Sequence, residues 1–160
     1  MSNIFLPEHF KIVTALAPQT SSGAKTFDNI QLRDAIMVWI VAEYTQAEIH
    51  ATTIQPVVGA TDGTCTTAIT FAAEWWSNVD TSTTDTLVAQ TAATSMACTA
   101  AATNHLLVIK IDPSDVAAQS ATYDWLGATQ ASSGQGTNFV SVTYYIQTRM
   151  PQATPRAQIA

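Results

Sequence analysis

Few residues in this chain could carry out chemistry, and the aspartates are the first to consider. Asp80 and Asp85 lie in one Thr-rich segment, Asp62 lies in a Thr-Asp-Gly turn, and Asp112 and Asp115 are close together. Such carboxylates could bind calcium or act as a general acid and base. The same residues also open turns and cap helices, and the Asp-Pro-Ser-Asp sequence is typical of an N-cap. We expect turn and cap roles, with an ion site at Asp80 and Asp85 as the alternative.

The histidines and cysteines do not form a metal-binding pattern. Cys65 and Cys98 are not part of a Cys-x-x-Cys motif, and the histidines lie far from both in sequence. A zinc site is therefore not expected, and two buried free thiols are predicted, with a disulfide as the alternative. Glu48 and His50 would share a strand face and could titrate together, although a His in this position is more often part of a surface or cross-strand pair than a ligand.

Known catalytic and phosphate-binding motifs are absent from the sequence. It has no Gly-x-Ser-x-Gly, His-Glu-x-x-His, Walker A or Gly-x-Gly-x-x-Gly motif. The Gly-containing segment 131–136 lacks the strand-to-helix context that a phosphate loop needs. We therefore predict that the protein is not an enzyme, and we assign no catalytic, cofactor or metal residues.

A pair of adjacent tryptophans is a stronger candidate for binding. Neighbouring residues of a strand point to opposite faces, so Trp75 and Trp76 cannot both face the same core. Trp75 continues the apolar parity of the preceding residues and is expected in the core, whereas Trp76 would point outward or lie at a sheet edge. An exposed Trp can anchor a protein interface or stack on a sugar, and burial under a second core or a covering loop is the alternative.

These residues must be positioned by strands, because apolar residues alternate along much of the chain. Residues 64–75 alternate strictly, with Phe71 on the apolar face, which predicts a half-buried antiparallel strand. Residues 35–44 are apolar on both parities, as in a strand covered on both faces; a helix is the competing prediction. Further strands are predicted at residues 10–17 (closed by Pro18), 27–32, 48–58, 86–90, 105–111, 123–129 and 138–149, with one helical turn at 114–118.

Some eight short strands without a sustained helical period predict an all-β fold, a jelly-roll-like antiparallel β-sandwich. The sandwich would comprise residues 10–149. Residues 1–9 are predicted to form an extended N-terminal arm and residues 150–160 a C-terminal tail.

Composition limits the partners that such a domain could bind. Only 11% of the 160 residues are charged, against about 25% in ordinary domains, and the net charge is −6. Six scattered cations argue against nucleic acid binding, which needs clustered ones. No signal-peptide pattern or membrane-length apolar run is present, so we expect a soluble protein made in a cytoplasm. A weakly charged exterior suits a subunit covered by its neighbours, although strand propensity of Thr alone could also produce it.

Several segments, in their order, resemble a family of tailed-bacteriophage head proteins known as decoration, cement or head-stabilising proteins. The resembling stretches are KIVTALAPQTSSGAKTFDNIQLRDAIMVWIVAEYTQ, AEWWSNVDTSTTDTLVAQTAAT, LLVIKIDPSDV, YDWLGAT and VSVTYYIQTRMP, which together span most of residues 11–151. The order of Asp85-Thr-Leu, Asp112-Pro and Arg149 carries the resemblance. The chain departs from the pattern at Ala89, where similar sequences often have Arg.

The resemblance implies a jelly-roll-like domain bound to the exterior of an icosahedral capsid, where it stabilises the contacts between major capsid protein subunits. Such proteins commonly act as homodimers or homotrimers. The resemblance and the arm and Trp arguments together give the predicted interface residues Ile4, Phe5, Leu6, Trp76, Asp85 and Arg149. The alternatives are another virion part, such as a tail tube or connector, or a carbohydrate-binding adhesion domain.

Overall fold

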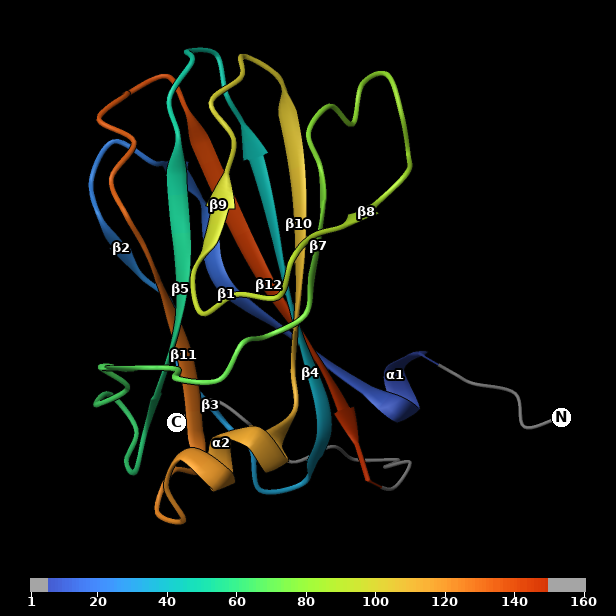
Figure 1. Cartoon of the computed structure of the whole chain (residues 1–160), viewed down its shortest axis with the longest axis vertical. Helices are drawn as coiled ribbons and strands as arrows, with labels where there is room; N and C mark the ends of the chain where they lie inside the picture. Colours follow the sequence, from blue (N-terminus) through green and yellow to red (C-terminus); the bar gives the residue numbers. More distant parts are fainter. Residues whose placement is uncertain (1–5, 150–160) are drawn as a thin grey trace, which may run out of the picture.

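The computed structural model describes residues 6–149, which form two antiparallel β-sheets packed face to face (Figure 1). Sheet A has the strand order β1-β12-β4-β10-β7-β8, comprising Phe10–Thr20, Phe139–Thr148, Ala35–Thr45, Asn104–Ile111, Trp75–Asn78 and Val88–Ala89. Sheet B has the order β2-β11-β5-β6, comprising Lys25–Thr26, Trp125–Gln130, Thr52–Gly59 and Thr67–Ala68; β3 (Ile30–Gln31) also pairs with β11, and β9 (Met96–Cys98) with β5.

The strand order is that of a jelly roll. The pairs β1–β12 and β4–β10 lie in sheet A, and they alternate along the chain with the pairs β2/β3–β11 and β5–β6/β9 in sheet B. This pattern results when one long antiparallel hairpin is wound into two layers. The predicted all-β sandwich is therefore confirmed.

The core lies between the sheets because side chains alternate along the long strands. In β10, for example, Leu107, Ile109 and Ile111 are buried, whereas the residues between them are half-buried. Strands β4 and β12 show the same alternation. The largest fully buried side chains are Tyr44, Tyr144, Phe27, Ile30, Ile40, Ile54, Met96, Leu107, Ile109, Ile111, Leu126 and Ile146.

The helix α2 (Pro113–Gln119) closes one end of the sandwich, next to β4 (Figure 1). The Asp112 carboxylate accepts hydrogen bonds from Ser114 N and Ser114 Oγ at 2.8 and 2.7 Å. Both bonds lower the pKa of Asp112, and the bond from Ser114 Oγ has the larger effect. Val116 is the buried residue of the helix and belongs to the core. The predicted cap and helical turn are thus both present.

The clearest alternation in the sequence does not form the single strand that it predicts. Within residues 64–75 only β6 and the first residue of β7 are strand, and the segment between them crosses from sheet B to sheet A. Cys65, Ile69 and Ala73 are buried, as their parity requires, whereas Phe71 is only half-buried. Alternation reports an extended backbone, but it does not specify a hydrogen-bonded partner strand.

Other predicted boundaries also need correction. Strand β1 continues through Pro18 to Thr20 because it pairs only with β12, and a register shift between Leu16 and Gln19 accommodates the proline. Strand β5 begins at Thr52, so Glu48 and His50 lie in an exposed loop rather than on a strand face. The short strand β9 was not predicted and contains Cys98.

The two arms fall largely outside the described residues. Residues 1–5 and 150–160 are not described, so Ile4, Phe5 and the C-terminal tail lie outside the described residues. At the described end of the N-terminal arm, Leu6–His9 form the short helix α1 where extended chain was expected. Leu6 itself is exposed.

Candidate interaction surface

The outward side of sheet A brings together side chains from five strands. In the register, Trp39 of β4 is paired with Tyr145 of β12 and Lys110 of β10, and Tyr145 is paired with Ile12 of β1. Side chains at paired positions lie on the same side of a sheet, whereas successive residues alternate. Figure 1 shows β1, β12, β4 and β10 side by side.

A second row crosses the sheet two residues further along. Val41 of β4 is paired with Thr143 of β12 and Val108 of β10, and Val108 is paired with Trp76 of β7. We call this surface the outer face of sheet A. Its members are Phe10, Ile12, Thr14, Met37, Trp39, Val41, Glu43, Trp76, Leu106, Val108, Lys110, Ser141, Thr143, Tyr145 and Gln147.

This face is apolar and only partly shielded by the chain itself. Ile12 is 48% exposed, and Trp39, Val41 and Val108 are half-buried. The Phe10 and Trp39 rings contact each other with centroids 5.7 Å apart at a tilt of 49°, so neighbouring side chains support the indole. The result is a sheet surface with rigid aromatic groups and no covering layer among residues 6–149.

Charge is sparse on this face. Its charged members are Glu43 and Lys110. Glu43 lies two residues from Val41 along β4, and Lys110 lies two residues from Val108 along β10, on the other side of the row. Lys110 Nζ binds Glu74 Oε2 at 2.8 Å; the side chain of Lys110 is 35% exposed and that of Glu74 62%. An ion pair this exposed contributes little to stability, so Lys110 can change partners at low cost.

The structure distributes the predicted interface residues over separate regions. Trp76 lies on the outer face, opposite in direction to Trp75, which packs against the core and donates its Nε1–H to Thr91 O at 2.9 Å. Asp85 lies in the exposed loop between β7 and β8. Arg149 follows β12 at the α2 end of the sandwich. The structure therefore does not gather these residues into one site.

The sequence interpretation missed Trp39 and Tyr145, although one signal pointed to them. Residues 35–44 were predicted to form a strand covered on both faces, and one face is indeed buried. The other face presents Met37, Trp39 and Val41, which this chain leaves half-exposed. Strand β4 therefore has the apolar pattern of a strand that is buried on both faces, but residues 6–149 bury only one of them.

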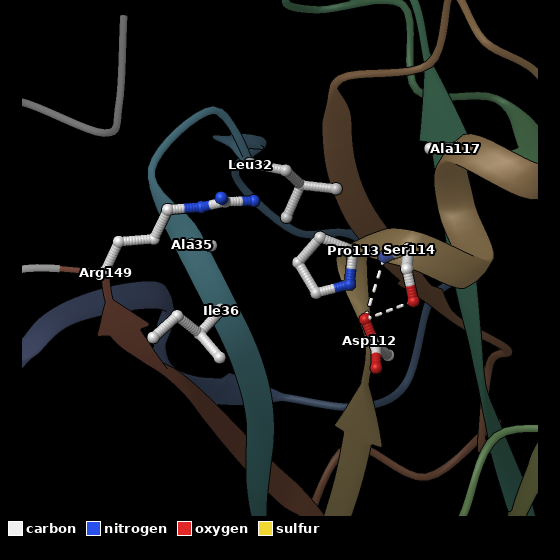
Figure 2. Close-up of a pocket in the computed structure, with 8 residues that line it drawn as sticks. All are labelled: Leu32, Ala35, Ile36, Asp112, Pro113, Ser114, Ala117 and Arg149. Atoms are coloured by element: carbon white, nitrogen blue, oxygen red, sulfur yellow. Dashed lines mark hydrogen bonds between the residues drawn. The ribbon is translucent and has the colours of Figure 1, made fainter.

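A cavity of about 650 Å³ lies between β4, α2 and the end of β12 (Figure 2). Its apolar lining includes Leu32, Ile36 and Pro113. Figure 2 shows the Arg149 side chain along one side of the cavity and Asp112 on the other. The Asp112 carboxylate accepts hydrogen bonds from the Ser114 backbone N–H and hydroxyl, which is the pattern of a helix N-cap.

The remaining reactive groups are buried or hydrogen-bonded within turns. Cys65 and Cys98 are buried free thiols, and burial raises their pKa values to about 11 and about 12, which disfavours the reactive thiolate. Asp80 accepts hydrogen bonds from Ser82 N and Ser82 Oγ in its own turn. Among residues 6–149, no group of three or more His, Cys, Asp or Glu side chains is placed to hold a metal ion.

His105 is a buried titratable side chain in sheet A. Its ring is buried, with Nε2 3.0 Å from Thr103 Oγ1 and 3.3 Å from Ala101 O. Burial lowers the pKa of His105, and the Ala101 carbonyl and Asp80 only partly oppose that shift. In the unfolded chain the pKa returns to about 6.5, so below that pH the unfolded state binds more protons than the folded state.

We therefore expect the free energy of unfolding to fall as the pH is lowered from about 7.5 to about 5.5, a range above the titration of ordinary carboxylates. Chemical denaturation at a series of pH values measures this. His105→Gln should lower stability at neutral pH and remove most of the slope in that range. An unchanged slope in the variant would show that other groups are responsible.

Comparisons with known proteins do not place the chain in a family. No family model matches the sequence, and no curated protein matches it. Solved structures do match the fold, among them the crystal structure of the SPBc2 prophage-derived protein YomS. That match has a TM-score of 0.47 and 12% sequence identity, and it covers 86% of this chain and 91% of that chain. The resemblance to phage decoration proteins therefore stays a prediction.

No helix in the described part of the chain is long and apolar enough to span a membrane.

Proposed function

We propose that this chain is a non-enzymatic structural protein of a phage virion, which binds the outside of an icosahedral capsid and stabilises contacts between major capsid protein subunits. The outer face of sheet A is the observation that carries the proposal. It presents Trp39, Tyr145 and Trp76 from adjacent strands of a rigid sheet.

Such a face has the properties of a protein-binding surface. Aromatic side chains dominate interface energetics, and charged residues are depleted at interface centres. Here the central row consists of Thr, Val and Trp side chains, with Glu43 and Lys110 set to either side. Contiguous apolar surface of this kind is uncommon on a protein that stays alone in solution.

The assignment to a capsid exterior comes from the segments that resemble phage decoration proteins. The proposal places Leu6 and Arg149 outside the sheet face, where they are free to contact major capsid protein subunits. Several modest contacts made by one oligomer multiply in affinity, which suits a protein that holds a lattice together. The protein would be made in the host cytoplasm and act without binding nucleic acid or membrane.

Purified full-length chain mixed with empty expanded shells tests the proposal. We expect saturable co-sedimentation, and cryo-electron microscopy should show the protein on the outer surface. Trp76→Ala should weaken attachment by about 2 kcal/mol, as for an interface anchor, while lowering the free energy of unfolding by less than about 1 kcal/mol.

Thr67→Ala, in β6 of sheet B, is the matched control and should bind normally. Failure of the unmodified chain to bind any expanded shell would contradict the capsid assignment.

A carbohydrate-binding role is the second candidate, favoured by the aromatic side chains on an open sheet face. Indole and phenol rings can stack on sugar rings as well as on protein surfaces. A glycan array separates the two: selective glycan binding that is lost in Trp76→Ala would favour an adhesion domain.

A further inference from the structure

We propose that the outer face of sheet A is the interface of a symmetric homodimer, in which two copies of this chain pack face to face. The inference rests on the proposed function and assigns a second copy as the partner of that face. The shell is then contacted by residues outside the face, such as Leu6 and Arg149, and Trp76→Ala weakens attachment by weakening the dimer. Four observations support it: the uncovered apolar row, the placement of charge, the extent of the face and the protection of the sheet edges.

The pattern of side chains fits a two-fold axis that crosses the strands at the Val41–Val108 row. The axis lies between the two sheets and runs parallel to this row, so it places each strand over the same strand of the partner copy with its direction reversed. A residue two positions to one side of the row therefore faces the residue two positions to the other side of the row on the partner copy. Tyr145, a large residue before the row, would oppose Ser141, a small residue beyond it on the same strand. This pair places a large group against a small one, whereas Trp76, on the row itself, would face Trp76 of the partner copy.

The charges are also self-complementary under this axis. Glu43 lies beyond the Val41 row and would oppose Trp39 of the partner copy, whose cross-strand neighbour is Lys110. Each Glu43 would therefore approach a Lys110 of the other copy, and the two contacts are equivalent by symmetry. Lys110 would then lie between Glu43 of the other copy and its own partner Glu74, whose carboxylate it binds at 2.8 Å.

The face is large enough for a stable dimer. Its fifteen members lie on strands about 4.8 Å apart, with outward residues about 6.8 Å apart along each strand, and cover on the order of 500 Å² per copy in plan. Specific interfaces bury about 800 Å² of accessible surface per partner, and a corrugated side-chain surface exceeds its plan area. The outer face is therefore comparable with an ordinary dimer interface.

The sheet edges are poorer sites for association. The edge strand β8 has two residues, Val88 and Ala89. The other edge strand of sheet A, β1, contains Pro18 and two register shifts. Short strands, prolines and bulges are the features that block edge-to-edge pairing. Among the surfaces of sheet A, the face is thus better suited to self-association than either edge.

Sedimentation equilibrium of the full chain, together with variants at Val108, tests the inference. The unmodified chain should have twice the mass of one copy. Val108 lies close to the axis and would face its own counterpart, so Val108→Glu and Val108→Lys should each raise the dimer Kd on the order of 100-fold by placing like charges together. An equimolar mixture of the two variants should recover dimers, because opposite charges then meet.

Thr67→Glu, on sheet B, is the matched control and should stay dimeric. If a Val108 variant does not fold by circular dichroism, the pair of charges provides the test instead: Glu43→Lys should weaken the dimer, and Glu43→Lys with Lys110→Glu should restore it. A monomer at all concentrations, an undiminished dimer in Val108→Glu, or a trimer would overturn the inference.

The inference and the proposed function can fail separately. A dimer that binds no shell would support the dimer interface and contradict the capsid role. A monomer that binds shells would contradict the dimer interface and support the capsid role.

Discussion

Phe27→Ala is expected to lower the free energy of unfolding by about 3–5 kcal/mol, because it removes a large side chain from a packed core. Phe27 is 2% exposed within the core, and its backbone N–H donates to Ala128 O at 2.9 Å, which holds this backbone segment next to β11. Urea denaturation followed by circular dichroism measures the change.

Phe71→Ala is the matched comparison for this prediction. The alternation in residues 64–75 gives Phe71 the role of a core residue, but the structure leaves it half-buried in the crossing segment. We therefore expect a loss of about 1–2 kcal/mol, since only part of the side chain leaves an apolar environment. Equal losses in the two variants would show that residues 64–75 are packed as a full core strand.

Gly59→Ala is expected to destabilise the fold by about 1–3 kcal/mol, the usual range for overpacking. A Cβ at Gly59 would lie 2.8 Å from Thr64 O and 3.1 Å from Cys65 Cα and N. All three are backbone atoms, so relief requires the turn after β5 to move. Thermal and chemical denaturation would both report the loss.

Gly23→Ala provides the control, because a Cβ there would meet no atom within 4 Å. It should be neutral or slightly stabilising, since alanine restricts the unfolded chain. A neutral Gly59→Ala would mean that the 59–65 turn is not held against β5 as the structure shows.

The sequence predicted the architecture better than the pairing of its strands. Residues 138–149 alternate in sequence, and Tyr144 is buried on their apolar face. Residues 35–44 were recognised as a strand, but they are apolar on both parities, so alternation did not identify the side of Ile40 as the core face. Strand β9 has three residues in a weakly patterned segment, so its buried Met96 and Cys98 could not be recognised. Short strands depend on a distant partner, which local propensity does not specify.

The candidate surface was predictable only in part, for a related reason. The parity argument placed Trp75 inward and Trp76 outward, and the structure shows the same directions. That Trp39 and Trp76 share one face depends on β10 lying between β4 and β7, a long-range arrangement. The sequence indicated that residues 35–44 are covered on both sides, but not that a second molecule could supply one cover.

The most direct test of the central claim, that another protein covers the outer face of sheet A, is hydroxyl-radical footprinting of the full chain. The chain would be compared as a dilute monomer and in its assembled form. We predict that Trp39, Tyr145 and Trp76 lose reactivity together on assembly, while Trp125 of sheet B changes less and serves as the internal reference. Outer-face aromatics that stay as reactive in the assembly as in the monomer would contradict the account.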